Sequence, residues 1–262
     1  MKIKNNKKIG LALGGGAVLG AAHVGVLRAL NEHNIQINFI TGTSIGAFVA
    51  ALFAFGKTWK EIESIALELK WMDITSITLS KYALLSNEKL GELLIKHIGN
   101  RNIEDAEIPL AFIATDISSG EKVVLDTGNI AIAVMASACI PGIFKPIEIN
   151  GKMLVDGGIA ENIPVKTIRE MGAKFIIGVD LNAKHTYQKP NNILDVIMNS
   201  FHFLIQKTDK FQTKKADLLF QPDLSKFNGS DTKYVQELME KGYEEANEGL
   251  RKSFRKTTGS LN

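Results

Sequence analysis

Several glycines of this chain cluster at two places where a short apolar run is followed by a helical pattern. Three stand together at 14–16, directly after the apolar run 8–13. Two more, Gly42 and Gly46, flank the junction between a second apolar run and the helical pattern 45–55. Glycine lets the backbone turn sharply and lets neighbouring segments approach closely. These junctions therefore predict tight strand-to-helix turns, as in layered α/β folds.

Strand and helix patterns alternate along the whole chain. The predicted strands are 8–13, 38–42, 109–115, 122–125, 153–155, 174–181 and 218–220. The predicted helices are 21–31, 45–55, 58–69, 87–98, 129–138, one opening at Pro164, 192–212 and 231–254, with 71–86 irregular. This alternation predicts an α/β fold of three layers, with a mostly parallel central sheet and helices on both faces. The length of 262 residues fits one such domain over 1–262, with the motifs within 8–182 and 183–262 completing it.

Composition excludes several classes of protein. The formal net charge is +3, from 31 basic and 28 acidic residues, which is too weak to indicate a nucleic-acid partner. The single cysteine, Cys139, excludes an intramolecular disulfide and a multi-cysteine zinc cluster, and it fits a reducing, cytoplasmic compartment. The histidines show no metal-ligand spacing, so the sequence predicts no metal and no cofactor. They are His23, His33, His97, His185 and His202.

Two stretches imitate membrane signals. Residues 1–22 combine N-terminal lysines with an apolar run, as a secretory signal peptide does, but glycines interrupt that run. Residues 34–56 carry no charge over a length that can span a bilayer, but polar residues and glycines interrupt them too. A strand followed by a turn explains both stretches better. The sequence therefore predicts no transmembrane helix.

The segment 42–46 reads Gly-Thr-Ser-Ile-Gly and lies between a predicted strand and a predicted helix. In this context G-x-S-x-G is typical of a serine nucleophile raised above the edge of a sheet. The free N–H groups at the start of the helix would favour negative charge beside Ser44. The alternative is a serine that merely caps a buried helix.

The loop 13–20, Leu-Gly-Gly-Gly-Ala-Val-Leu-Gly, can aim backbone N–H groups at an anion. A dinucleotide site would need G-x-G-x-x-G and an acidic residue at the next strand, and neither is present. A phosphate loop would need a lysine after Gly20, which is also missing. An oxyanion hole, which stabilises charge developing on an ester oxygen, is the best functional interpretation. Simple close packing of helix on strand is the structural alternative.

Asp156-Gly157-Gly158 follows a short apolar strand. By itself this is an ordinary Asp-Gly turn. Asp156 becomes the candidate base because a serine nucleophile needs a proton acceptor and no histidine lies in a recognisable motif. An unperturbed aspartate titrates near about 4 and would already be an acceptor at neutral pH.

The combination of these motifs resembles the patatin-like phospholipases. G-G-G-x-x-x-G, G-T-S-I-G and D-G-G follow in that order, and three further segments fit its bacterial members: A-T-D at 114–116, A-S-A-C-I-P-G-I-F at 136–144 and N-I-P at 162–164. The resemblance implies hydrolysis of phospholipids or other fatty-acyl esters by a Ser–Asp dyad. It makes Ser44 the nucleophile and Asp156 the base. The residues matching the oxyanion loop are Gly14, Gly15, Gly16 and Ala17, and those supporting the motifs are Gly42, Gly46, Gly157 and Gly158.

Two positions depart from the family pattern. Leu19 stands where an arginine is common, and Ala17 where a fourth glycine is common. The backbone donors survive both changes unless Ala17 must take a positive φ. If the family arginine aids anionic substrates, Leu19 also affects head-group preference.

Other functions stay open on the sequence alone. One is a Ser-His-Asp esterase acting on soluble esters, and another is a non-catalytic lipid- or nucleotide-binding protein. The segment 71–86 could flank an acyl groove or be a plain connection. Residues 192–215 combine aromatic residues with lysines. Such a helix could lie on a membrane surface, but more often it packs its aromatic residues inward and leaves its lysines in solvent. A homodimer is a further open prediction.

Overall fold

The computed structural model describes residues 8–68, 76–80, 82–184, 186, 189–227 and 232–258. Its central sheet has eight strands in the order β10-β9-β1-β2-β5-β8-β7, with β6 on the other edge of β5. The parallel strands are β1 (Ile9–Leu13), β2 (Phe39–Thr43), β5 (Leu110–Asp116), β9 (Phe175–Val179) and β10 (Leu218–Phe220). The antiparallel strands are β6 (Lys122–Leu125), β7 (Ile147–Ile149) and β8 (Lys152–Asp156). The predicted mostly parallel α/β sheet is confirmed.

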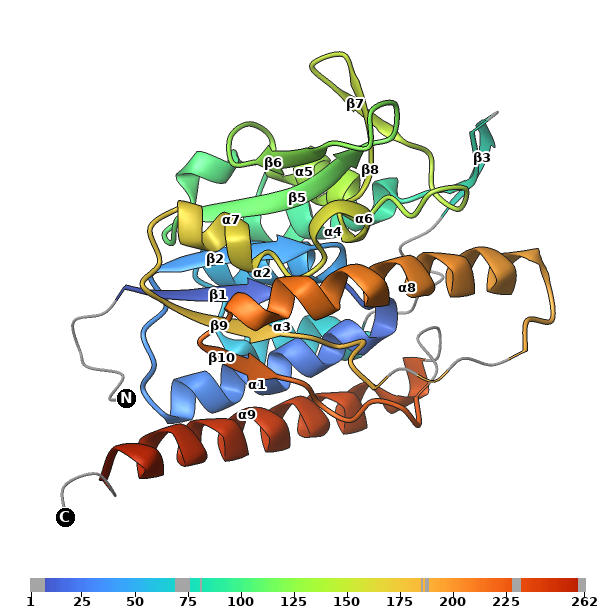
Figure 1. The fold of residues 1–262 in the computed structure, drawn as a ribbon. Helices are drawn as coiled ribbons and strands as arrows, with labels where there is room; N and C mark the ends of the chain where they lie inside the picture. The colour runs from blue at the N-terminus through green and yellow to red at the C-terminus, as the bar shows by residue number, and fades with distance from the viewer. Residues whose placement is uncertain are drawn as a thin grey trace.

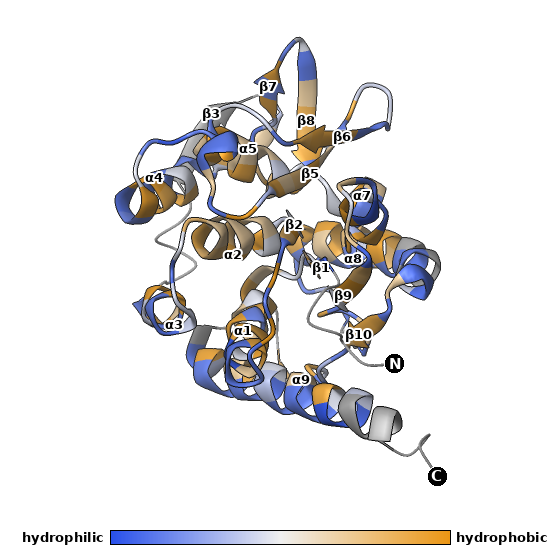
Figure 2. Cartoon of the chain, turned by 90° about the vertical axis from the view of Figure 1, so that its left-hand side faces the viewer, coloured by the Kyte–Doolittle hydropathy of each residue, from blue (hydrophilic) through white to orange (hydrophobic). Residues whose placement is uncertain are grey.

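Helices cover both faces of this sheet (Figures 1 and 2). One layer holds α1 (Ala22–Glu32), α2 (Ile45–Ala54), α3 (Trp59–Glu68), α4 (Glu88–Ile98), α5 (Ile130–Ser137) and α9 (Val235–Thr258). The other holds α6 (Gly158–Glu161), α7 (Val165–Glu170) and α8 (Ile193–Gln212). Strands β1, β5 and β9 are buried along their whole length, as expected of strands covered on both faces. Among the described residues, no helix is both long and apolar enough to cross a membrane.

Several short elements differ from the sequence prediction. Part of the predicted irregular segment forms a hairpin of β3 (Ser76–Ser80) and β4 (Ala83–Ser86). The sequence prediction also missed β7, α6 and the short 3-10 helix η1 (Ala17–Ala21). Such elements contain too few residues to show a hydrophobic period, and their partners lie elsewhere in the chain. Trp71 and Met72, predicted beside an acyl groove, lie outside the described residues.

Strands β2 and β8 approach each other along the same edge of β5. Thr43, the last residue of β2, pairs with Ile113, and Asp156, the last residue of β8, pairs with the next residue, Ala114. Strand β6 occupies the opposite edge of β5 over these same residues. Because β2 is parallel to β5 and β8 is antiparallel to it, their carboxyl ends meet. The topology thus brings segments more than 100 residues apart to one point.

Helices α1 and α9 lie side by side at one end of the molecule (Figure 1). A Cβ on Gly25 of α1 would overlap the carbonyl oxygen of Met239, and a Cβ on Gly242 of α9 would overlap that of Ala22. Both obstacles are backbone atoms, which cannot rotate away. This reciprocal contact requires glycine on both helices.

We expect Gly25→Ala to lower the free energy of unfolding by at least about 2 kcal/mol, because the added methyl group forces the two helices apart. Urea denaturation with an unchanged m-value measures this loss. Glu237→Ala, at an exposed position of α9, is the control and should change stability by less than about 0.5 kcal/mol. An unfolding midpoint of Gly25→Ala equal to that of the wild type would contradict the packing argument.

Candidate active site

Ser44 lies between β2 and α2 in a strained backbone conformation. Its φ is 56° and its ψ is −127°, a region that residues with a side chain rarely adopt. Its N–H donates to the Ser137 hydroxyl at 3.0 Å, and that hydroxyl donates to the Ile113 carbonyl of β5 at 2.6 Å. The turn is therefore tied to the central strand by a buried side chain that the sequence prediction did not assign a role.

Gly42 and Gly46 make this turn possible. A Cβ on Gly42 would overlap the first turn of α2 at the Gly46 carbonyl. A Cβ on Gly46 would overlap the backbone of Leu13 and lie 2.7 Å from the Gly14 carbonyl. The G-x-S-x-G pattern therefore packs the turn against the end of β1.

Asp156 is fully buried at the end of β8. Its N–H donates to the Cys139 carbonyl at 2.8 Å, and its Oδ1 accepts from the Gly158 N–H at 2.8 Å. Burial raises the pKa of this carboxyl to about 7, while the bonds from Gly158 and the Ser44 hydroxyl lower it. The sequence expectation of an ordinary aspartate is thus wrong, because burial penalises the ionised form. The Oδ2 of Asp156 is buried and has no hydrogen-bond partner among the described residues, which leaves this oxygen available to accept a proton.

The glycines after Asp156 serve different purposes. A Cβ on Gly157 would overlap the Ile113 carbonyl of β5, so this position must be glycine for β8 to end where it does. Gly158 supplies the N–H that orients the carboxylate. Both positions therefore support the placement of Asp156.

The glycine loop contributes fewer free donors than predicted. The Gly14 N–H donates to the Val179 carbonyl of β9, and the Gly15 N–H donates to Asn162 Oδ1 at 3.0 Å. Gly15, Gly16 and Ala17 line one pocket with Ser44 and Asp156, whereas Gly14 does not line it. This corrects the expectation for Gly14, whose N–H completes the sheet instead.

Both departures from the family pattern have structural consequences. Ala17 takes a φ of 50°, the strained condition under which a fourth glycine would be favoured. Leu19 is buried in the main hydrophobic core rather than facing the pocket. Its side chain therefore does not contact a head group from this position.

A buried polar network behind the loop was missing from the sequence prediction. Asn162 Nδ2 donates to Asp209 of α8 at 2.9 Å, and Asn182 Nδ2 donates to the Gly15 carbonyl at 2.8 Å. Burial and the charge of Asp180 raise the pKa of Asp209 to about 8, against the hydrogen bond from Asn162. The sequence indicated only one part of this network, the segment N-I-P at 162–164. Asp209 lies far away in sequence, so no local pattern connects it to the glycine loop.

The pocket around Ser44 is almost closed, with a volume of about 10 Å³. Apart from the loop, Ser44, Asp156 and the two asparagines, its lining consists of Ile140, Met198, Phe201, His202 and Ile205. The last four belong to α8, which the sequence prediction did not place at the site.

The histidines differ in their relation to this pocket. His202 lines it from α8. His23 is buried beneath the glycine loop, where its Nε2 lies 2.8 Å from the Gly14 carbonyl, and burial lowers its pKa to about 4. His33 contacts Asn247, and His185 lies outside the described residues. Among the described residues, no group of three or more potential ligands could hold a metal ion.

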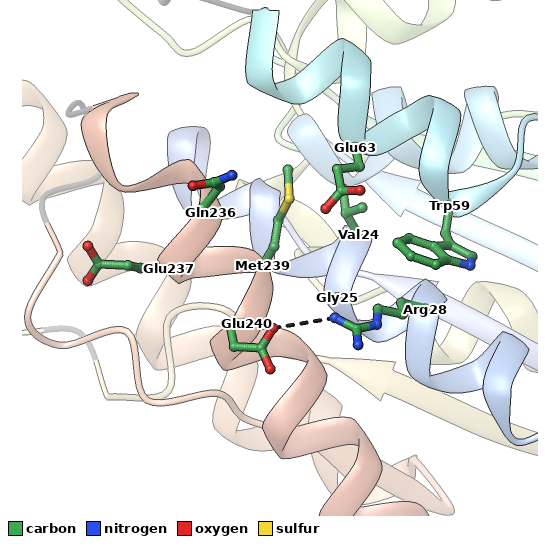
Figure 3. A pocket seen from close by; sticks show the side chains of 9 residues that line it. All are labelled: Val24, Gly25, Arg28, Trp59, Glu63, Gln236, Glu237, Met239 and Glu240. Carbon is green, nitrogen blue, oxygen red and sulfur yellow. Dashed lines mark hydrogen bonds and ion pairs between the residues drawn. The ribbon is translucent and has the colours of Figure 1, made fainter.

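A larger hollow of about 340 Å³ lies between α1, α3 and α9 (Figure 3). Arg28 at its rim donates to Glu240 at 3.4 Å and to Glu32 at 3.0 Å, and its guanidinium lies over Trp59. None of the predicted catalytic residues lines this hollow. The smaller pocket, which holds Ser44 and Asp156, is therefore the candidate active site.

Comparisons with known proteins cover the part of the chain that contains Ser44 and Asp156. Residues 11–168 match the family model described as patatin-like phospholipase. The chain is 32% identical to a lysophospholipase NTE1 of Meyerozyma guilliermondii over 80% of this chain and 15% of that protein. It is 33% identical to an NTE family protein of Mycobacterium tuberculosis over 68% of this chain and 50% of that protein. The chain thus spans half or less of the length of these relatives.

Two solved structures share the fold. VipD from Legionella pneumophila matches with a TM-score of 0.53 at 15% identity, covering 94% of this chain and 67% of that one. ExoU in complex with SpcU from Pseudomonas aeruginosa matches with a TM-score of 0.51 at 14% identity, covering 94% and 52%. At such identities the likeness concerns the fold alone.

We expect Ser44→Gly to be about 1 kcal/mol more stable than Ser44→Ala. Neither variant has a hydroxyl, so the comparison isolates the strain of a Cβ at positive φ, about 1–3 kcal/mol against an entropic cost of glycine of about 0.5–1 kcal/mol. Thermal and urea unfolding of the pair measures the difference. Equal stability of the two variants would mean that the turn is not strained.

Proposed function

The chain belongs to the patatin-like phospholipase family, and from this premise we propose that it hydrolyses the carboxylic esters of lipids with Ser44 as nucleophile and Asp156 as base. The observation that carries the proposal is the meeting of β2 and β8 along one edge of β5. It brings the Ser44 hydroxyl to a buried carboxylate beside a glycine loop. The lipid substrate class follows from similarity to the patatin-like phospholipase family and to the lysophospholipase NTE1 relative.

In the proposed reaction, Ser44 Oγ attacks the ester carbonyl carbon while Asp156 accepts the hydroxyl proton. The tetrahedral intermediate collapses, the alcohol leaves with the proton from Asp156, and the acyl group stays on Ser44. Water then attacks the acyl-enzyme and gives a proton to Asp156; the acyl–Ser44 bond breaks, the fatty acid is released, and Asp156 returns that proton to Ser44 Oγ. Both half-reactions use the same base.

The oxyanion would be stabilised by the N–H groups of Gly16 and Ala17. Their neighbours Gly14 and Gly15 already donate elsewhere, whereas these two residues line the pocket without another hydrogen bond from their N–H among the described residues. The N-terminus of the ten-residue helix α2 adds a favourable dipole at Ser44. Losing one such donor typically costs about 10²–10³ in rate.

A Ser-His-Asp mechanism is the second candidate, because His202 lines the same pocket. In that mechanism the His202 imidazole would take the serine proton, and Asp156 would only orient the imidazole ring. The direct contact between the Ser44 hydroxyl and the Asp156 carboxylate, with no histidine between them, favours the dyad.

We expect Ser44→Ala to abolish hydrolysis of p-nitrophenyl esters and lipids and to abolish labelling by a fluorophosphonate probe. Asp156→Asn should lose at least about 10³ in rate, because asparagine cannot accept the proton as a carboxylate does. His202→Gln is the matched control within the same pocket and should stay within about tenfold of the wild type. If His202→Gln fell as far as Ser44→Ala while Asp156→Asn stayed active, the triad would replace the dyad.

We expect kcat/KM for a neutral p-nitrophenyl ester to rise with pH through about pH 7, where burial places the pKa of Asp156. Only the ionised carboxylate accepts the proton, and kcat/KM reports the pKa of the free enzyme. One unit below that pKa, about a tenth of the molecules are active. A profile that is flat between pH 5 and pH 8 would show that the base is an ordinary exposed carboxylate.

A further inference from the structure

The pocket that contains Ser44 and Asp156 has no room for an ester of a fatty acid. Its volume of about 10 Å³ is close to the space of one water molecule. Met198, Phe201 and Ile205 of α8 close it. If the pocket is the catalytic site proposed above, α8 must move before a lipid can enter.

The opposite face of α8 is apolar and exposed. Ile193 is 71% exposed, Val196 and Phe203 are each 48% exposed, and Leu204 is 43% exposed. With 3.6 residues per turn these positions fall on one side of the helix, away from Met198 and Ile205. A helix of this kind has one apolar face against the protein and a second one toward solvent, which is costly in water.

The exposed face is bordered by positive charge toward its carboxyl end. Lys207 on α8, and Lys214 and Lys215 in the 3-10 helix η4 (Thr213–Lys215) that follows, are exposed. At the other end, Asn192 caps the helix by accepting from the Asp195 N–H at 3.0 Å, and the Asp195 carboxylate accepts from the Asn191 N–H at 2.8 Å. Apolar side chains beside lysines are typical of helices that bind anionic lipid surfaces.

The two halves of α8 are held differently. The first half packs through Ile197, Met198 and Phe201 on a small cluster around Cys139 and Ile140, which is separate from the main core. The second half is anchored by polar contacts: Asp209 accepts from Asn162, and Gln212 donates to the Ala160 carbonyl at 3.1 Å. The first half can therefore leave the pocket without disrupting the main core. Figure 1 shows this part of α8 extending beyond the sheet.

We propose that the outer face of α8, formed by Ile193, Val196, Phe203 and Leu204, docks on an anionic lipid surface, and that docking draws the first half of the helix away from the Ser44 pocket. The inference rests on the proposed function for the identity of the site. A lipid surface offers apolar cover for the outer face and, once the inner face is withdrawn, for Met198 and Phe201 as well.

Cys139 supplies a built-in reporter of this movement. It is the only cysteine in the sequence, it is fully buried, and α8 residues pack on its cluster. Burial raises the pKa of its thiol well above the ordinary value. Withdrawal of α8 would expose the thiol and speed its reaction with a disulfide reagent such as 5,5′-dithiobis(2-nitrobenzoate).

The experiment uses the full chain carrying Ser44→Ala, so that neither readout depends on catalysis. We expect it to co-sediment with vesicles containing phosphatidylglycerol, and we expect those vesicles to speed Cys139 labelling at least about tenfold. Adding Val196→Ser and Leu204→Ser should reduce vesicle binding by at least about tenfold, because two apolar side chains no longer enter the lipid. Adding Ile132→Ser instead, at a 45% exposed position of α5, is the matched control and should leave both readouts unchanged.

Three outcomes would overturn the proposal: no vesicle binding, labelling unaffected by vesicles, or equal binding of the double variant with an unchanged melting transition. A dimer in light scattering that the double variant dissociates, without vesicle binding, would assign the face to a second copy of the chain. If binding and labelling behave as expected while the wild type lacks esterase activity, the docking surface stands and the proposed function fails.

Discussion

The structure depends on how β5 is paired along one of its edges. β2 and β8 run toward each other there and end opposite the consecutive residues Ile113 and Ala114. The hydroxyl of Ser137 then ties the Ser44 turn to the Ile113 carbonyl. Because β5 is buried on both faces, these hydrogen bonds are shielded from water and hold their geometry. The Ser44 hydroxyl and the Asp156 carboxylate, from distant parts of the chain, are thereby fixed against one rigid strand.

This arrangement costs stability at several positions. Ser44 and Ala17 both have positive φ values, although neither is glycine. Asp156 and Asp209 are buried carboxyls whose pKa values burial raises. Strained backbone and buried ionisable groups cluster at functional sites, where the surrounding fold stabilises them. Their concentration around one pocket is an independent reason to place the chemistry there.

Helix α8 connects the pocket to the protein surface. Its inner residues close the space around Ser44, and its Asp209 completes a polar network through Asn162 to the Gly15 N–H. The same helix exposes a row of large apolar side chains to solvent. Substrate entry and the geometry of the glycine loop would therefore be coupled through one element. In the proposed function, this coupling would let a lipid surface control access to the dyad.

The sequence by itself determined the α/β class, most long elements, and the three segments that carry the candidate chemistry. Those features are local: glycines at 14–16 and at 42 and 46 mark turns that only small residues permit, and apolar periods mark the elements between them. Only the tertiary structure decided which donors of the glycine loop are free, because the partners of Gly14 and Gly15 are Val179 and Asn162. It also decided the pKa of Asp156 and the cover provided by α8. Burial and hydrogen-bond pairing depend on residues far apart in the chain, and a linear pattern does not encode which of them will meet.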